Sequence, residues 1–434
     1  MEDYLNVSES PFPLPANIRI TTLPNGLRVA TDTMPHVETV TTGVWIGVGS
    51  RHEPLAANGV AHLVEHMLFK GTPTRDAFAI SAEIENVGGH LNAYTGREQT
   101  TYYAKVLKED FGLALGILAD MVQHPLFDEA ELEKERQVIL QEIGQAEDTP
   151  DDIVYDHFLA TAFPQQRLGR PVLGTAEIVS SLPRAALSDY VRGRYVASNM
   201  VLAAAGNVRH EDAVEMALRL FADLPTGDGA DSEVGRYQGG EFREDRDLEQ
   251  THLLLGFNGI ASTDPDLYNA MVLSTLLGGG MSSRLFQEVR EKRGLVYSVH
   301  SFNWSMSDSG VFGIYAGTGP ESTAELVPVV CDEVRKLSRT LTREELVRAR
   351  AQLKASQLMG LESTNNRAEQ LGSHLLVYNR PIPPAEIVAR LDAVTLEDVA
   401  ACADRIFGST PTVTALGPLE GLESYGDIAG RLAA

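Results

Sequence analysis

A short and otherwise apolar segment carries three polar side chains that a buried helix cannot hold without a partner. Residues 59–69 are Gly-Val-Ala-His-Leu-Val-Glu-His-Met-Leu-Phe, with polar groups at His62, Glu65 and His66. Two histidines four residues apart project from one face of a helix, one turn above each other, and Glu65 stands beside them. Unpaired histidine and glutamate are costly to bury, and buried polar clusters usually have a partner. The segment therefore predicts a helix with a metal site.

The order His-x-x-Glu-His is that of a zinc-hydrolase motif in reverse. The two imidazoles can bind zinc, and Glu65, displaced by one residue from the histidine pair, can reach a water at the metal as general base. The competing interpretation is that His62, Glu65 and His66 are ordinary helix residues. The apolar surroundings argue against it, because they would leave the three groups buried and unpaired.

A second helix, expected at about residues 129–147, can supply the missing ligand. Leu132, Ile139 and Ile143 mark its apolar face. Glu135 and Glu142 fall on or beside that face, where acidic residues need a partner. Catalytic zinc holds three protein ligands and leaves one position for water, so a site with two histidines needs one further residue. Spacing leaves both glutamates open; Glu142 is preferred, with Glu135 orienting a ligand or balancing charge.

Length and composition set the limits for the rest of the chain. With 434 residues, 43% of them apolar, it can form two or three domains with full cores. No run of eighteen apolar residues and no signal-peptide pattern is present, which predicts a cytoplasmic protein without a membrane span. The formal net charge of −24 disfavours nucleic acid; it would attract basic peptides, and the equal alternative is that it only keeps the protein soluble.

Strands are expected on both sides of the motif. Residues 18–23 and 27–30 flank a Pro-Asn-Gly turn that indicates a hairpin, and residues 40–48 form another apolar run. Residues 49–54 form a loop in which His52 is expected to be solvated. Residues 88–106 are rich in threonine and tyrosine and indicate further strands. An edge strand there could pair with an extended peptide, with Asn92 fixing its backbone, although most such strands are only structural.

The second half of the chain repeats the first. Residues 178–182 and 387–391 match at an offset of 209, and a helix and a strand follow in both copies. Residues 225–240 are rich in Gly, Asp and Ser without apolar periodicity, which indicates a linker. The predicted organisation is an N-terminal arm at 1–16, a first domain at 17–224, the linker at 225–240 and a second domain at 241–434.

The second copy lacks the residues of the metal site. The offset of 209 places Met271, Ser274 and Thr275 opposite the His-x-x-Glu-His motif, and an offset of 214 places Ala349 and Ser356 opposite the two glutamates of the second helix. The sequence therefore predicts one metal site on a duplicated scaffold.

Several motifs together resemble the pitrilysin, insulinase and mitochondrial processing peptidase family of inverted zinc peptidases. They are His62-x-x-Glu65-His66, Glu142 within residues 135–143, Asn-Ala-Tyr-Thr at 92–95, Glu98-x-Thr100-x-Tyr102, Leu-Gly-Gly-Gly-Met-Ser-Ser-Arg-Leu-Phe at 277–286, and Arg-Glu-Lys-Arg-Gly-Leu-Val-Tyr-Ser at 290–298. The length is similar to that of the short bacterial processing-peptidase-like branch, in which two chains close like a clam shell around an unfolded peptide. The glycine run at 278–280 lacks the ending of a phosphate-binding loop; substrate handling and a simple turn remain equal alternatives for it.

The resemblance implies a role for each matching residue. It implies one zinc ion per chain held by His62, His66 and Glu142, water activation by Glu65, support from Glu135, substrate pairing along Asn92 and Ala93, and a grip on the peptide backbone or oxyanion by Arg290 and Tyr297. In short-chain relatives the last two come from the partner subunit.

The combined prediction is an α+β protein of two homologous domains, each a mainly antiparallel sheet with packed helices. Its predicted function is zinc-dependent endopeptidase activity on unfolded or short peptides, within a homodimer. One alternative is a non-catalytic subunit, or one that depends on a related chain in a heterodimer. A further alternative is a metal-binding regulatory module without hydrolysis.

Overall fold

The structure is a computed structural model that describes residues 11–227, 229 and 232–433. The chain divides into two compact units, each assembled from segments distant in sequence. The first comprises Met1–Ile143, Pro171–Glu233 and Leu358–Ala385; the second comprises Gly144–Arg170, Val234–Gln357 and Glu386–Ala434. Residues 1–10 of the expected N-terminal arm lie outside the described residues.

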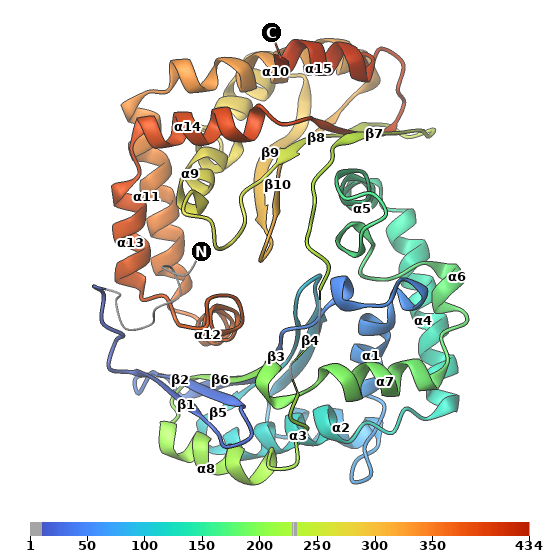
Figure 1. The fold of residues 1–434 in the computed structure, drawn as a ribbon, viewed down its shortest axis with the longest axis vertical. Coiled ribbons are helices and arrows are strands. Elements are labelled where there is room, and N and C mark those ends of the chain that lie inside the picture. Colours follow the sequence, from blue (N-terminus) through green and yellow to red (C-terminus); the bar gives the residue numbers. More distant parts are fainter. Residues whose placement is uncertain (1–10, 228, 230–231, 434) are drawn as a thin grey trace. The chain divides into compact units, whose positions relative to one another are not determined.

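The first unit is built on a six-stranded sheet (Figure 1). Its strands, in spatial order, are β1 (Ile18–Thr22), β2 (Arg28–Thr33), β6 (Met200–Gly206), β3 (Thr39–Ile46), β5 (Thr100–Leu107) and β4 (His90–Thr95). All neighbours are antiparallel except β2 and β6. The hairpin expected around Asn25-Gly26 is present as β1 and β2. Central strand β6 is buried along its whole length, which explains its continuous apolar sequence.

The helices of this unit pack on the two faces of the sheet or on one another. They are α1 (Val60–Leu68), α2 (Ala77–Glu85), α3 (Phe111–Gln123), α4 (Glu129–Glu147), α6 (Ala176–Val179), α7 (Arg184–Arg194), α8 (His210–Leu220) and α12 (Thr364–Tyr378). One apolar core joins one sheet face to helices that include α1 and α3. On the other face α12 packs against β6, β3 and β2. The helix predicted at about 129–147 is confirmed by the bounds of α4.

The second unit is built on a five-stranded sheet. Its strands, in spatial order, are β7 (Gly240–Asp245), β11 (Thr412–Gly417), β8 (Thr251–Asn258), β10 (Gly310–Thr318) and β9 (Val296–Ser305). Its helices are α5 (Pro150–Ala162), α9 (Leu267–Gly278), the π-helix η6 (Phe286–Glu291), α10 (Thr323–Thr340), α11 (Arg343–Gly360), α13 (Pro384–Ala393), α14 (Leu396–Phe407) and α15 (Tyr425–Ala433). Short 3₁₀ turns occur in both units. Those of the first unit are η1 (Ser50–His52), η2 (Leu55–Ala57), η3 (Lys108–Asp110) and η5 (Ala197–Asn199), and those of the second are η4 (Arg167–Gly169) and η7 (Pro320–Ser322).

Five strands of the first sheet correspond to the five strands of the second. The order β2-β6-β3-β5-β4 matches β7-β11-β8-β10-β9, and the one parallel pair occupies the same place in each. Strand β1 has no counterpart in the second sheet. The predicted α+β class, with two homologous and mainly antiparallel domains, is confirmed.

One helix from each half packs on the sheet of the other half. Helix α5 follows α4 in the chain but packs on β11, β8 and β7, whereas α12 follows α11 and packs on β6, β3 and β2. The compact units therefore differ from the continuous ranges 17–224 and 241–434 in these two segments. The limits of the arm, the linker and the repeats remain predictions.

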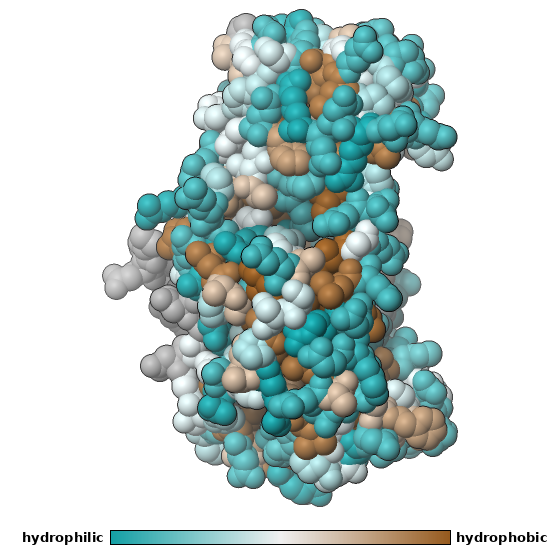
Figure 2. Space-filling view, turned by 90° about the vertical axis from the view of Figure 1, so that its right-hand side faces the viewer, coloured by the Kyte–Doolittle hydropathy of each residue, from teal (hydrophilic) through white to brown (hydrophobic). Residues whose placement is uncertain are grey.

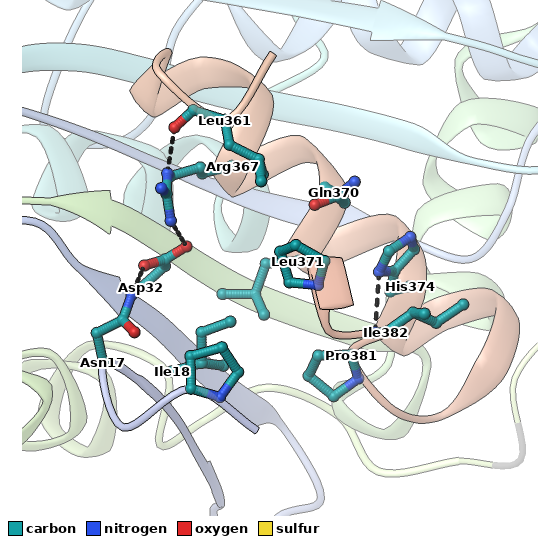
Figure 3. A pocket seen from close by; sticks show the side chains of 12 residues that line it. Asn17, Ile18, Asp32, Leu361, Arg367, Gln370, Leu371, His374, Pro381 and Ile382 are labelled. Carbon is teal, nitrogen blue, oxygen red and sulfur yellow. Dashed lines mark hydrogen bonds and ion pairs between the residues drawn. The ribbon is translucent and has the colours of Figure 1, made fainter. Parts of the chain in front are cut away.

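Polar contacts attach α12 to the first sheet (Figure 3). The buried Asp32 carboxylate accepts a hydrogen bond from Asn17 Nδ2 at 2.5 Å and pairs with Arg367 Nη1 at 2.8 Å. Beside this pair is a cavity of about 210 Å³, and none of its lining residues belongs to the predicted metal site. Farther along α12, Trp45 Nε1 donates to Glu369 Oε2 at 3.0 Å. These contacts fix the helix across the sheet.

The exterior is mainly hydrophilic on the face that Figure 2 displays, with apolar residues in separate patches. Among the described helices, none has both the length and the apolar composition needed to cross a bilayer.

Gly372 provides a test of the packing of α12. A Cβ atom at Gly372 would lie 2.4 Å from Trp45 Cδ2, whereas one at Gly116, in α3, would meet nothing within 4 Å. We expect Gly372→Ala to destabilise the protein by about 1–3 kcal/mol through overpacking. We expect Gly116→Ala to stabilise it by roughly 0.5–1 kcal/mol, because alanine favours a helix over glycine. Denaturant unfolding measures both; equal effects would contradict the close contact with Trp45.

Candidate metal centre

The start of α1 is fixed by a buried carboxylate. The helix begins after Gly59, whose φ of +95° favours glycine, and a Cβ atom there would lie 2.8 Å from Leu173 O. Glu53 accepts hydrogen bonds from the backbone N–H groups of Gly59 at 2.9 Å and Ala61 at 2.8 Å. Such a carboxylate satisfies N–H groups that the helix leaves unpaired. Burial raises the pKa of Glu53 to about 7, and these hydrogen bonds oppose the rise.

Two helices bring three candidate ligands together. His62 and His66 lie on α1, and Glu142 lies on α4. Glu142 Oε2 is 3.9 Å from His62 Nε2 and 3.7 Å from His66 Nε2, and one ligand atom from each residue lies within 4.8 Å of the others. Tetrahedral zinc with bonds of 2.0–2.2 Å places its ligand atoms about 3.4 Å apart. The observed separations are close to that spacing.

The unsatisfied atoms of this cluster fit a bound cation. Glu142 Oε2 is buried, and within the described part of the chain it has no hydrogen-bond partner. A carboxylate oxygen in that position is costly unless a positive group faces it. Two neutral imidazole nitrogens and one carboxylate oxygen are a donor set that zinc accepts.

Glu135 lies behind His66. Its Oε2 is 3.0 Å from His66 Nδ1, and its Oε1 pairs with Lys70 Nζ at 2.7 Å. In the tautomer that carries its proton on Nδ1, His66 donates a hydrogen bond to Glu135, and its unprotonated Nε2 is directed at Glu142. The structure therefore separates the two glutamates that spacing left as alternatives: Glu142 faces both imidazoles, and Glu135 contacts one of them from outside.

Glu65 lies beside the three candidate ligands and is hydrogen-bonded to a residue of β4. The Thr95 hydroxyl donates a hydrogen bond to Glu65 Oε2. Burial raises the pKa of Glu65, and the Thr95 hydrogen bond opposes this rise. A carboxyl group with a raised pKa is suited to accept a proton and later release it.

His62 is kept neutral by its surroundings. Burial, and then the neighbouring charge of His66, lowers the pKa of His62 to about 4. A neutral imidazole has a lone pair available for a metal without first losing a proton.

The predicted substrate-pairing residues lie at the edge of the same sheet. Asn92 and Ala93 belong to β4, which pairs with β5 on one side and is an edge strand of the sheet. Asn92 is exposed. A cavity of about 560 Å³ lies beside β4, lined by Phe69 at the end of α1 and by Ile84 and Glu85 of α2, among others.

Arg290 and Tyr297 lie in the second compact unit, on η6 and β9. The Arg290 guanidinium carbon is 5.5 Å from the centre of the Tyr297 ring, and Tyr297 is largely exposed. The two side chains thus form a cation–π pair. Their predicted action on substrate remains a prediction.

Sequence reasoning did not identify three contributors to the site: Glu53, Lys70 and Thr95. Thr95 belongs to the quoted Asn-Ala-Tyr-Thr motif, and Lys70 follows His66 by four residues, so weak signals existed for both. The expectation for His52 is wrong: it is buried, and its Nδ1 accepts a hydrogen bond from Gly49 N at 3.0 Å within the turn before α1.

Comparison with known proteins shows which class of protein has this fold and cluster. The family model described as Insulinase (Peptidase family M16) matches residues 28–176, and the one described as Peptidase M16 inactive domain matches residues 181–353. The chain belongs to the M16 peptidase family. Consistent with the second description, α9 carries Met271, Ser274 and Thr275 where the first half has its motif.

Relatives cover nearly the whole chain. A protein named uncharacterized zinc protease from Rickettsia felis is 42% identical over 403 residues, 93% of this chain and 98% of the relative. The probable mitochondrial-processing peptidase subunit beta of Arabidopsis thaliana is 42% identical over 94% of this chain and 80% of its own length. The crystal structure of a protease from Helicobacter pylori has a TM-score of 0.86 at 25% identity, covering 92% of this chain and 99% of that one.

The lowered pKa of His62 can be tested in metal-free protein. We expect NMR to show His62 titrating near pH 4, well below an ordinary histidine. The unfolded chain takes up this proton near pH 6.5 and the folded chain only near pH 4, so stability should fall as the pH decreases between these values, by about 3 kcal/mol.

The variant His62→Gln assigns the resonance and removes the effect. It should lose less stability than wild type between pH 6.5 and 4. A His62 resonance that titrates near pH 6.5 would contradict the desolvated environment.

The contact between Glu135 and His66 leads to a prediction about metal affinity. We expect Glu135→Gln to weaken zinc binding by about 10- to 100-fold, since carboxylates that orient a ligand histidine typically contribute that much. Competition with a chelator measures the change. Glu129→Gln, at an exposed position of the same helix, is the matched control and should bind zinc like wild type; an equal loss in both variants would argue against an orienting role.

Proposed function

We propose that this protein is a zinc-dependent endopeptidase in which His62, His66 and Glu142 hold one zinc ion and Glu65 is the general base. The observation that carries the proposal is the buried Glu142 oxygen, which faces two imidazole nitrogens and lacks a hydrogen-bond partner in the described structure. Membership of the M16 peptidase family, with relatives named zinc proteases, supports it.

Each residue of the site has its own role in the proposed reaction. When bound, zinc supplies Lewis acidity that activates water and polarises a carbonyl group. Glu65 takes the proton of the attacking water and later delivers it to the leaving amine, a step that suits a half-buried carboxyl group with a raised pKa. Glu135 and Lys70 hold the orientation of His66.

The edge strand β4 supports an extended peptide as substrate. Main-chain groups at a sheet edge can pair with an added strand, and neighbouring cavities then select side chains. Asn92 and Ala93 would provide that pairing, next to the cavity between β4 and α2. Only an unfolded or short peptide can adopt the required conformation, and the net charge of −24 favours basic ones.

The proposal includes a clam-shell homodimer in which Arg290 and Tyr297 of a partner subunit grip the peptide or the oxyanion. The specific alternative is a heterodimer with a related chain, favoured by the 42% identity to a protein named a beta subunit. A cytoplasmic location remains a prediction from the sequence.

The variant Glu65→Gln tests the proposal directly. We expect it to bind zinc like wild type but to hydrolyse a fluorogenic peptide mixture about 10²- to 10⁴-fold more slowly, because general base catalysis contributes that much. Metal analysis and initial rates on the same preparations provide both readouts. Glu133→Gln, at an exposed position of α4, should match wild type in both.

The other outcomes distinguish the alternatives. Activity retained in Glu65→Gln would contradict the assigned base. Zinc in both proteins with activity in neither would favour a subunit that needs a related chain, and activity on mixing with that chain would establish it.

A further inference from the structure

Thr95 links the edge strand to the carboxylate of Glu65. It is the last residue of β4, and its hydroxyl donates to Glu65 Oε2. Thr95 pairs with Thr100 of β5, whose own hydroxyl donates to Val48 O at 2.9 Å. The Thr95 hydroxyl therefore lies on a strand that is fixed by its pairing with β5.

The turn that follows Thr95 is fixed by the segment that leads into α1. Ser50 N donates to Gly96 O at 3.1 Å, and Arg51 N donates to Arg97 O at 3.0 Å. The buried Arg51 side chain pairs with Glu98 at 2.5 Å. The same segment continues to Glu53, which caps α1. Hydrogen bonds made by residues 50–53 thus connect the end of β4 to the start of α1. These bonds fix the position of Thr95 relative to the helix that carries Glu65.

The hydrogen bond from Thr95 restricts the orientation of the Glu65 carboxylate. Glutamate has several side-chain torsions, and in a helix its carboxylate can reach more than one position. Threonine is β-branched and has a restricted χ1 angle, so its hydroxyl is itself well positioned. A hydrogen bond to Oε2 selects one orientation and leaves the second oxygen of Glu65 to accept a proton.

We infer that Thr95 is a positioning residue, which holds Glu65 in the orientation needed for proton transfer. This inference rests on the proposed function, in which Glu65 is the base and β4 binds the peptide. Because Thr95 ends the strand that includes Asn92 and Ala93, the peptide backbone and the base are aligned by one rigid element.

Kinetics of two substitutions test the role of the hydroxyl. Thr95→Val keeps the shape and removes the donor; we expect kcat to fall about 10- to 100-fold, as misplacement of a catalytic group by about 1 Å can cause. KM should change less than about twofold, and zinc content should stay the same, since the hydrogen bond of the hydroxyl goes to Glu65, which is not among the candidate zinc ligands. Thr95→Ser keeps the donor and should restore kcat to within about threefold of wild type.

The matched control is Thr22→Val. Thr22 also ends an edge strand of the same sheet, β1, and is exposed. It should leave kcat, KM and zinc content unchanged. If Thr95→Val fails to fold, Thr95→Ala provides the same comparison with a smaller side chain.

Crystal structures of wild type and the Thr95 variants provide a readout that does not depend on activity. In wild type and Thr95→Ser, Glu65 should occupy one conformer with Oε2 at the hydroxyl. In Thr95→Val it should move by about 1 Å or more, or divide between conformers, because no donor selects one rotamer.

Three results would overturn the inference: an unchanged single Glu65 conformer in Thr95→Val, a Thr95→Val kcat equal to that of wild type, or a Thr95→Ser variant as slow as Thr95→Val. A wild-type protein that cleaves no peptide would defeat the proposed function instead, and the Glu65 conformers would still decide whether Thr95 positions this side chain.

Discussion

The candidate metal centre depends on one arrangement, an oxygen of the Glu142 carboxylate that is itself buried and faces two imidazole nitrogens without a hydrogen bond from the described residues. A folded chain keeps such an oxygen only if something else compensates for its burial. A divalent cation would do so, and its binding free energy would then contribute to folding. The contact of His66 with Glu135, and the cap on α1, serve this arrangement because they fix the direction of the donor atoms.

The two sheets show that the fold itself does not require this chemistry. Five strands have the same order in both, with the same single parallel pair, yet the group that could hold a metal ion, as far as the described residues show, lies in the first half. The counterpart helix α9 is largely buried and carries Met271, Ser274 and Thr275 at the positions opposite the motif. Function therefore lies in a few substituted positions on a duplicated scaffold. The exchange of α5 and α12 between sheets also means that neither half covers its own sheet completely.

Sequence reasoning succeeded where the signal is local. Apolar periodicity and the Asn-Gly turn identified α4 and the first hairpin, and burial of polar groups within an apolar run identified α1. It preferred Glu142 over Glu135, but spacing alone did not separate them, since both lie near one helix face; in the structure Glu142 faces Nε2 of both histidines, whereas Glu135 contacts only Nδ1 of His66. It missed the helix exchange, because α5 and α12 have equivalent positions in the repeat. It also missed Glu53 and Thr95, whose roles arise from contacts between separate elements.

The charges of the site explain how a strongly acidic chain can hold it. The lowered pKa of His62 leaves that imidazole neutral, so the candidate ligand set contains one carboxylate, Glu142, with Glu65 beside it. Together the two carboxylates would balance one divalent cation, and Lys70 pairs with Glu135. The centre is then close to neutral as a unit. Most of the net charge of −24 therefore lies outside this cluster, where it acts over longer distances on charged molecules that approach the protein.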